Sequence, residues 1–157
     1  MRLIYFLITI FILLSESVFG QYDINYYDDF SNNKHSWSIG NDDDLRTEIK
    51  NGVFEIEHKR DISSYNIWQE FNIEQDQDFY IETKLKQISG VDDWGFGLVW
   101  GARAWSNSHY FLLASNGMFT VAGYKNKNWN TLKDWTDETS INPIGKYNIL
   151  AVKKVKD

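Results

Sequence analysis

The feature that most constrains this chain is the absence of a helical pattern after its first twenty residues. No segment of 12 or more residues there spaces its apolar side chains at helical intervals, whereas short alternating and aromatic-rich runs recur along the chain. Residues 79–88 show the alternation most clearly, because Phe79, Ile81 and Leu85 share one face and Glu82, Lys84 and Lys86 share the other. The sequence therefore predicts an all-β fold of seven to nine antiparallel strands in one domain.

Two Asn-Gly pairs mark expected hairpins. Asn51-Gly52 lies between runs at 45–50 and 53–58, and Asn116-Gly117 lies between runs at 110–114 and 118–124. Both central residues of a type I′ turn need positive φ, which Asn and Gly tolerate. We expect a tight two-residue turn at each pair. Further strands are expected at 65–71, 79–88, 94–101 and 147–155.

The first twenty residues have the pattern of a secretory signal peptide. Arg2 precedes an apolar run from Leu3 to Leu14, and Val18-Phe19-Gly20 precedes the expected cleavage point. A run of this length is shorter than the ~20 residues that span a bilayer. We therefore expect residues 1–20 to be removed, leaving a secreted, periplasmic or cell-surface domain of residues 21–157 without a membrane span.

Composition excludes several functions. The net charge is -6, and no run of Lys and Arg is long enough to follow a nucleic-acid backbone, so we expect no nucleic-acid partner. The chain has no cysteine, and its three histidines lack the spacing of a helical metal pair, so no metal site is predicted from them. Calcium at 41–44 or at Asp92-Asp93 stays open, because these acidic runs offer hard oxygen ligands.

The order of several short motifs resembles the concanavalin A-like lectin and glucanase domains (laminin-G-like) of secreted bacterial proteins. The motifs begin with Asp28-Asp29-Phe30-Ser31 and Trp37, and they continue with 97–101, 110–112, Trp129 and Asp134-Trp135-Thr136. The resemblance covers nearly all of residues 21–157. It implies a two-sheet β-sandwich of jelly-roll type, whose concave sheet in relatives often binds or cleaves glycans.

Exposed aromatic side chains are the candidate glycan contacts, because a flat ring can stack on the C–H face of a sugar. Trp105 lies in a polar segment and is the first candidate for an exposed ring, while Trp129 follows the polar turn 125–128. Trp94 is a further candidate, at the start of the strand expected at 94–101. We expect the other bulky side chains of that strand to lie in the core. Arg103 and His109 could donate hydrogen bonds to sugar hydroxyls.

Non-catalytic carbohydrate binding or adhesion is the favoured function. A glycoside-cleaving enzyme is the first alternative, but it needs a pair of carboxylates, and the nearest candidate, Glu55 with Glu57, is typical of a solvated strand face. No catalytic residue is assigned. A structural or protein-interaction module is the second alternative, because a fold alone does not define a function.

The last predicted strand has no consistently polar face, which is typical of a strand with neighbours on both sides. The resembling family usually continues with another hairpin after this point. We therefore expect a domain that lacks its C-terminal hairpin and has an unpaired edge, guarded only by Lys153, Lys154 and Lys156. Such an edge predicts self-association.

Overall fold

The computed structural model describes residues 26–60, 64–70 and 77–156, and in these residues it has nine β-strands and no helix. The all-β prediction is confirmed. The strands are β1 (Gly40–Asn41), β2 (Leu45–Lys50), β3 (Val53–His58), β4 (Phe79–Leu85), β5 (Phe96–Ala104), β6 (Asn107–Ala114), β7 (Met118–Lys125), β8 (Asn128–Asp137) and β9 (Asn148–Lys154).

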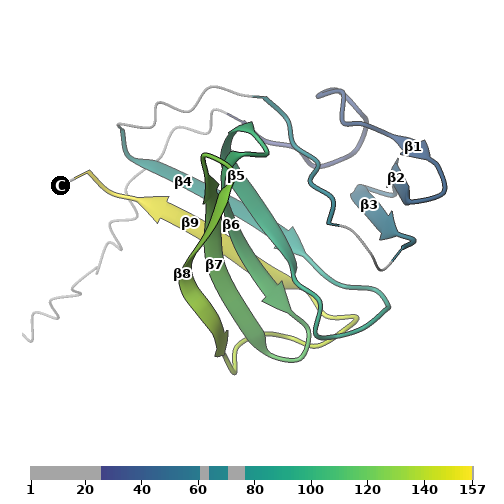
Figure 1. Cartoon of the computed structure of the whole chain (residues 1–157). Helices are drawn as coiled ribbons and strands as arrows, with labels where there is room; N and C mark the ends of the chain where they lie inside the picture. Colours follow the sequence, from purple (N-terminus) through teal and green to yellow (C-terminus); the bar gives the residue numbers. More distant parts are fainter. Residues whose placement is uncertain (1–25, 61–63, 71–76, 157) are drawn as a thin grey trace, which may run out of the picture.

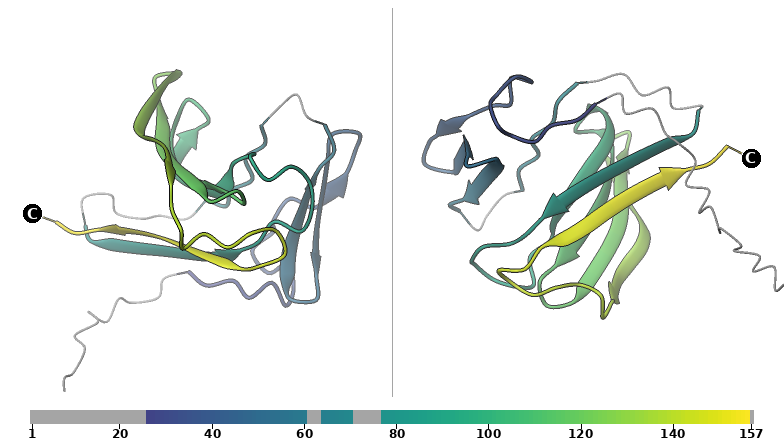
Figure 2. Two further views of the ribbon diagram at one scale, coloured as in Figure 1. Left: turned by 90° about the horizontal axis from the view of Figure 1, so that it is seen from below. Right: turned by 180° about the vertical axis from the view of Figure 1, so that it is seen from behind.

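The strands form three antiparallel sheets where two were expected. Their orders are β1-β2-β3, β4-β9 and β5-β6-β7-β8, so the third sheet is a meander of consecutive hairpins. Figures 1 and 2 show the β4-β9 sheet lying across one face of the β5–β8 sheet, with the small β1–β3 sheet to one side. The β4-β9 and β5–β8 sheets, facing each other, fit a β-sandwich.

The two Asn-Gly pairs form different turns. Lys50 pairs with Val53, and Asn51 and Gly52 both have positive φ (53° and 71°), which confirms the predicted two-residue hairpin. At the second pair, Ala114 pairs with Met118, so the loop has three residues, and only Gly117 has positive φ (95°). The two-residue turn predicted there is wrong, because a three-residue loop needs a left-handed residue only at its last position.

Two other predicted segments differ from the structure. Residues 64–70 form no strand, so the expected strand at 65–71 is wrong over its described part; residue 71 lies outside the described residues. The strand expected at 94–101 begins at Phe96 and continues to Ala104. A Cβ on Gly97 would lie 2.1 Å from the Phe111 carbonyl oxygen, so glycine permits the close approach of β6.

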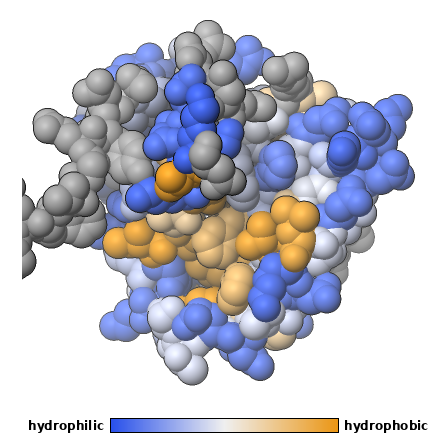
Figure 3. Space-filling view, turned by 90° about the vertical axis from the view of Figure 1, so that its left-hand side faces the viewer, coloured by the Kyte–Doolittle hydropathy of each residue, from blue (hydrophilic) through white to orange (hydrophobic). Residues whose placement is uncertain are grey.

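The interior between the β4-β9 and β5–β8 sheets is only partly closed. Leu113 of β6 and Leu150 of β9 are buried, and the strand alternation turns Phe79 and Ile81 of β4 to the same interior, where they are half-buried. Figure 3, which views the molecule from the left-hand side of Figure 1, shows a band of hydrophobic residues across this side. The sandwich therefore exposes part of its apolar interior.

A separate aromatic cluster supports the β1–β3 sheet. The ring of Phe54 on β3 lies 5.8 Å from that of Phe30 and 5.1 Å from that of Trp37. Trp37 Nε1 donates to Asp28 Oδ2 at 2.8 Å. The segments around Asp28 and Trp37, which carried part of the family resemblance, thus pack on one face of this sheet.

The expected signal peptide, residues 1–20, lies outside the described residues, as does the start of the domain at 21–25. Among the described residues, no helix has the length and apolar character needed to cross a membrane.

Candidate functional site

Two hairpin turns meet at one end of the β5–β8 sheet. Ala104 pairs with Asn107, so Trp105 and Ser106 form the β5–β6 turn. Asn126 and Lys127 form the β7–β8 turn, and both have positive φ (52° and 67°). The Lys127 N–H donates to the Ser106 carbonyl at 3.1 Å, and the Asn126 N–H donates to Asn107 Oδ1 at 3.1 Å. These two hydrogen bonds hold the turns side by side.

The joined turns place three aromatic rings together, which we call the tryptophan platform: Trp105, Tyr124 and Trp129. Trp105 lies 5.8 Å from Tyr124 at 82°, and Trp129 lies 5.0 Å from Tyr124 at 66°. Tyr124 and Trp129 are directly opposite each other in the register of β7 and β8. Trp105 and Trp129 keep 55% and 47% of their surface exposed. The platform thus offers two accessible indole rings, each in contact with the same tyrosine.

A buried tyrosine supports the platform from within. Tyr110 is 6% exposed, and its ring lies 5.5 Å from that of Trp129. Its hydroxyl shares a hydrogen bond with the Ser108 hydroxyl at 3.0 Å and accepts one from Asn66 Nδ2 at 3.2 Å. Because the polar end of Tyr110 is satisfied, its ring can be buried without an unpaired hydroxyl.

The same face of the sheet is filled away from the platform. Ala122 has no exposed surface and Thr120 is 4% exposed, although both alternate onto the face that carries Tyr110. The ring of Trp135, from β8, lies over this face as far as Gly95. The middle of the face is therefore occupied by the protein's own side chains, and the accessible aromatic surface lies at the turns.

The five predicted site residues do not form one site. Trp105 and Trp129 both contact Tyr124, as the platform. Trp94 lies at the other end of β5, where its ring is 5.9 Å from that of His58, which in turn lies 5.0 Å from Tyr65. Trp94 therefore lies apart from the platform, and its contact with a glycan stays a prediction.

His109 is also separate from the platform. Its ring stacks on Trp100 at 5.4 Å and 22°, and alternation along β6 places it on the face opposite Tyr110. The backbone of Arg103 belongs to β5, and its side chain lies outside the described part of the chain. Its expected hydrogen bond to a sugar hydroxyl stays a prediction.

Sequence reasoning missed Tyr124 and Tyr110 as site residues. A usable signal was present for Tyr124, because a two-residue turn at 126–127 necessarily sets residue 124 opposite residue 129. No local sequence pattern indicated Tyr110, since the hydrogen bond to its hydroxyl comes from Asn66, which is distant in the sequence.

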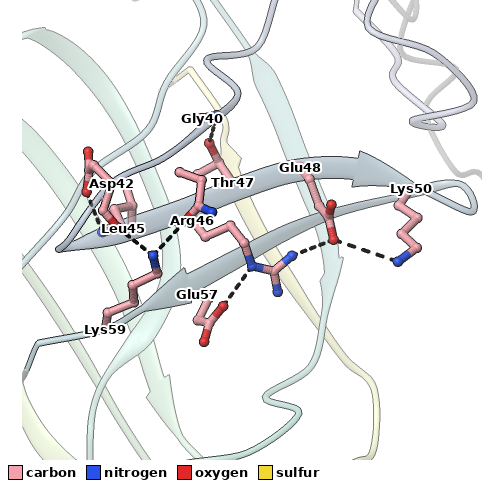
Figure 4. Close-up of polar contacts among 10 residues, drawn as sticks. Gly40, Asp42, Leu45, Arg46, Thr47, Glu48, Lys50, Glu57 and Lys59 are labelled. Atoms are coloured by element: carbon pink, nitrogen blue, oxygen red, sulfur yellow. Dashed lines mark hydrogen bonds and ion pairs between the residues drawn. The ribbon is translucent and has the colours of Figure 1, made fainter.

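The carboxylates considered for catalysis, Glu55 and Glu57, lie by alternation on the face of the β1–β3 sheet opposite Phe54. Arg46 donates to Glu57 at 2.7 Å and also forms an ion pair with Glu48 (Figure 4), while Glu55 lies opposite Glu48 in the register of β2 and β3. The hydrogen bond from Arg46 lowers the pKa of Glu57. These side chains form the solvated, charged face that the alternation indicated.

The acidic run at 41–44 uses its oxygens in the fold. Asp42 Oδ1 accepts the backbone N–H groups of Asp44 and Leu45, both at 2.8 Å, and these hydrogen bonds lower the pKa of Asp42. Lys59 donates to Asn41 Oδ1 at 2.6 Å. In the described ranges no group of three or more His, Cys, Asp or Glu side chains could hold a metal ion. Calcium binding stays a prediction.

A cavity of about 470 Å³ lies elsewhere, between the β5–β8 sheet and β9. Phe111, Leu113 and Phe119 line one wall, and Leu150 and the segment 138–142 line the other. The polar groups of this segment are partly engaged with β9, since the Asn142 N–H donates to Asn148 Oδ1 at 2.8 Å. None of the five predicted site residues lines this cavity.

Comparisons of the chain with protein-family models, with curated proteins and with solved structures found no match. The argument for function therefore depends on the chain's own residues.

Proposed function

We propose that the protein is a non-catalytic carbohydrate-binding module and that the tryptophan platform is its contact surface. The observation that carries the proposal is the pair of exposed indole rings, Trp105 and Trp129, which both contact Tyr124 and are held by two hydrogen-bonded turns. Aromatic rings contribute large contact area at low entropic cost when their position is already fixed. A sugar ring that lies on them replaces water on two apolar faces.

The chemistry of the rim suits the same ligand. Asn126 and Lys127 form the exposed β7–β8 turn next to β8, so an amide and an ammonium group lie at the end of the sheet that carries the platform. Amides and ammonium groups provide the donors and acceptors that sugar hydroxyls need. A platform at the end of a sheet, rather than a groove across it, favours a flat polysaccharide surface or a chain end as the ligand.

The catalytic alternative receives no support from the carboxylates. A general acid must hold its proton near neutral pH, so its pKa must be raised. Arg46 lowers the pKa of Glu57, which is the opposite change. Glu57 is therefore suited to an ion pair and not to proton donation.

Binding isotherms on insoluble and soluble neutral polysaccharides test the proposal. We expect the W105A and W129A variants each to weaken binding by about tenfold or more, because an exposed aromatic contact of this kind contributes roughly 1.4 kcal/mol or more. The matched control is Tyr27→Ala, which removes a ring that is 63% exposed in the N-terminal segment. Trp94→Ala, which alters the separate cluster with His58, should also leave binding unchanged.

Normal folding without binding to any neutral polysaccharide would contradict the proposal. Equal losses in the platform variants and in Tyr27→Ala would also contradict it, since the effect would then be nonspecific.

The finer assignment of the fold belongs to the same proposal. We infer a jelly-roll-like sandwich related to concanavalin A-like domains. Support comes from the two facing sheets and from β4 and β9, which are distant in sequence and pair along their full length. A secreted location, inferred from residues 1–20, would bring such a module to extracellular polysaccharides.

A further inference from the structure

The outer face of the β4-β9 sheet carries cations that the platform does not use. This face points away from the β5–β8 sheet, and by alternation it presents Tyr80, Glu82, Lys84, Ile149, Ala151 and Lys153, with Lys86 and Tyr147 just beyond the strand ends. Three lysines and one glutamate share it, in a chain whose net charge is -6. The face is therefore locally basic on an acidic protein.

Two of these lysines converge on one aromatic ring. Lys84 Nζ lies 4.5 Å and Lys86 Nζ lies 4.7 Å from the centroid of the Tyr147 ring. The two ammonium groups can therefore be no further apart than the sum of these distances. A cation–π contact contributes about 0.5–1 kcal/mol at an exposed site, which offsets the repulsion between two neighbouring charges in water. Tyr147 thus holds the two cations close together.

The carboxylate nearest in the strand does not neutralise them. Glu82 accepts a hydrogen bond from the Tyr80 hydroxyl. In the described segments, Lys84 and Lys86 form no ion pair with a carboxylate, in contrast to Arg46 and Lys50 of β2 and to Arg60. Lys84 and Lys86 therefore keep their charges available to an anion from outside.

We propose that Lys84, Lys86 and Tyr147, which we call the lysine–tyrosine face, bind an acidic polysaccharide through the carboxylates of its uronate units. Charge complementarity carries the choice of ligand. Lys84 of β4 and Lys86, just beyond the strand, both lie against the Tyr147 ring and so offer two neighbouring positive charges. A polymer with a carboxylate on each sugar presents the complementary charges.

Tyr147 acts in this site as a positioning residue. Without the ring, the two lysine side chains would separate to reduce their repulsion, and the anion would have to bring them together again. Removal of the ring should therefore weaken anion binding although it changes no charge.

The test measures binding of polygalacturonate, alginate and hyaluronan to the full domain by calorimetry, with fully methyl-esterified polygalacturonan as the uncharged ligand control. We expect binding of at least one acidic polymer, weakened by added salt and about tenfold weaker in the K84A/K86A variant. Y147L should weaken it by about threefold and Y147F should restore it. The matched control K50A/K133A removes two positive charges elsewhere and should have little effect.

Several outcomes would overturn this proposal. The methyl ester could bind as tightly as the acidic polymer, K84A/K86A could bind unchanged, or no acidic polymer could bind at all. The protein could also bind only anionic vesicles, or the K84A/K86A variant could change only in self-association. The proposal is independent of the platform, because K84A/K86A should keep binding to neutral polysaccharides and W129A should keep binding to acidic ones. Loss of both kinds of binding in W129A would assign all binding to the platform.

Discussion

Trp135 of β8 lies against Gly95, which precedes β5: a Cβ on Gly95 would come within 2.9 Å of Trp135 Cη2. In a flat sheet β5 and β8 are separated by three strand spacings, about 14 Å. A tryptophan side chain does not reach that far, so the β5–β8 sheet must be strongly curled. The curl brings the two outer strands toward each other over the face that carries Tyr110.

The glycines at this curl should differ sharply in their tolerance of alanine. Gly97→Ala meets the Phe111 carbonyl oxygen at 2.1 Å, and that backbone atom cannot move without breaking the β5–β6 pairing. We expect a loss of about 3 kcal/mol or more. Gly95→Ala meets the far end of the half-exposed Trp135 ring at 2.9 Å and comes into ordinary contact with Leu112 Cβ at 3.4 Å, so it should cost about 1 kcal/mol.

Urea unfolding followed by tryptophan fluorescence measures both losses. The control is Gly40→Ala, where nothing lies within 4 Å of the added Cβ and the change should stay within about 0.5 kcal/mol. Equal stability of the Gly97 and Gly40 variants would show that β5 and β6 do not approach as described.

The two Asn-Gly turns should respond differently to alanine at the asparagine. Asn51 has positive φ (53°), so Asn51→Ala should destabilise the protein by about 1 kcal/mol. Asn116 is not in the left-handed region, so Asn116→Ala should be nearly neutral, whereas Gly117→Ala should cost about 1–2 kcal/mol. Chemical denaturation of the three variants checks this order, and a larger loss at Asn116 than at Asn51 would contradict it.

Acid should destabilise the β1–β3 sheet through Asp42. Its pKa is lowered from 3.8 by two backbone N–H donors, so the ionised form is favoured in the folded state. The resulting stability is present above the ordinary pKa and is lost as the pH falls through the lowered value. Asp42→Asn should therefore be less stable than the natural protein at neutral pH, with a difference that shrinks below about pH 4.

Thermal unfolding of both proteins from neutral pH to about pH 2.5 measures this change. Asp43→Asn is the control, as a neighbouring exposed carboxylate in the same run. A constant difference between Asp42→Asn and the natural protein at all pH values would exclude the titration of Asp42 as the cause.

The edge of the β4-β9 sheet should support self-association. In the described residues β9 pairs only with β4, so its other edge presents backbone groups that another chain could pair with. Replacing Lys153, Lys154 and Lys156 with threonine removes the charges that oppose such pairing and should increase the sedimentation coefficient at high concentration. A protein that stays monomeric in both forms at every concentration would show that this edge does not associate.

Export should remove the first twenty residues. We expect the protein recovered outside the cell to begin at Gln21, as measured by intact-mass analysis and N-terminal sequencing. Ile8→Arg places a charge in the apolar run and should retain the uncleaved chain inside the cell. Recovery of an external protein that still carries residues 1–20 would contradict the predicted cleavage.

Local patterns predicted most of the strands because each pattern acts over a few residues. The alternation at 79–85 and the Asn51-Gly52 turn are of this kind. The turn at Asn116-Gly117 was not predictable, since the same dipeptide fits a two-residue or a three-residue loop and the pairing of Ala114 with Met118 decides between them. The segment 64–70 has strand-like aromatics, but in the structure Asn66 donates to Tyr110 and Gln69 donates to the Ser36 carbonyl.

The candidate site was predictable only in part. Trp105 and Trp129 were identified from the polar segments around them, which is a local signal. Their contact through Tyr124 depends on hydrogen bonds between two turns. The periodicity of apolar residues in a sequence does not indicate such hydrogen bonds. The positions of Trp94 and His109 apart from the platform were not predictable for the same reason, because their partners His58 and Trp100 are fixed by sheet packing and strand register.

The pairing of β4 with β9 has a consequence for the order in which the chain folds. The four strands β5 to β8 are joined by short hairpins and can form as each one is synthesised, because their contacts are local. β4 can pair only after β5 to β9 have been synthesised, because its partner is β9. The two-stranded β4-β9 ladder alone must offset the entropic cost of closing the long loop between these strands. The slowest step of folding should therefore be the docking of β9 on β4, with the meander already in place.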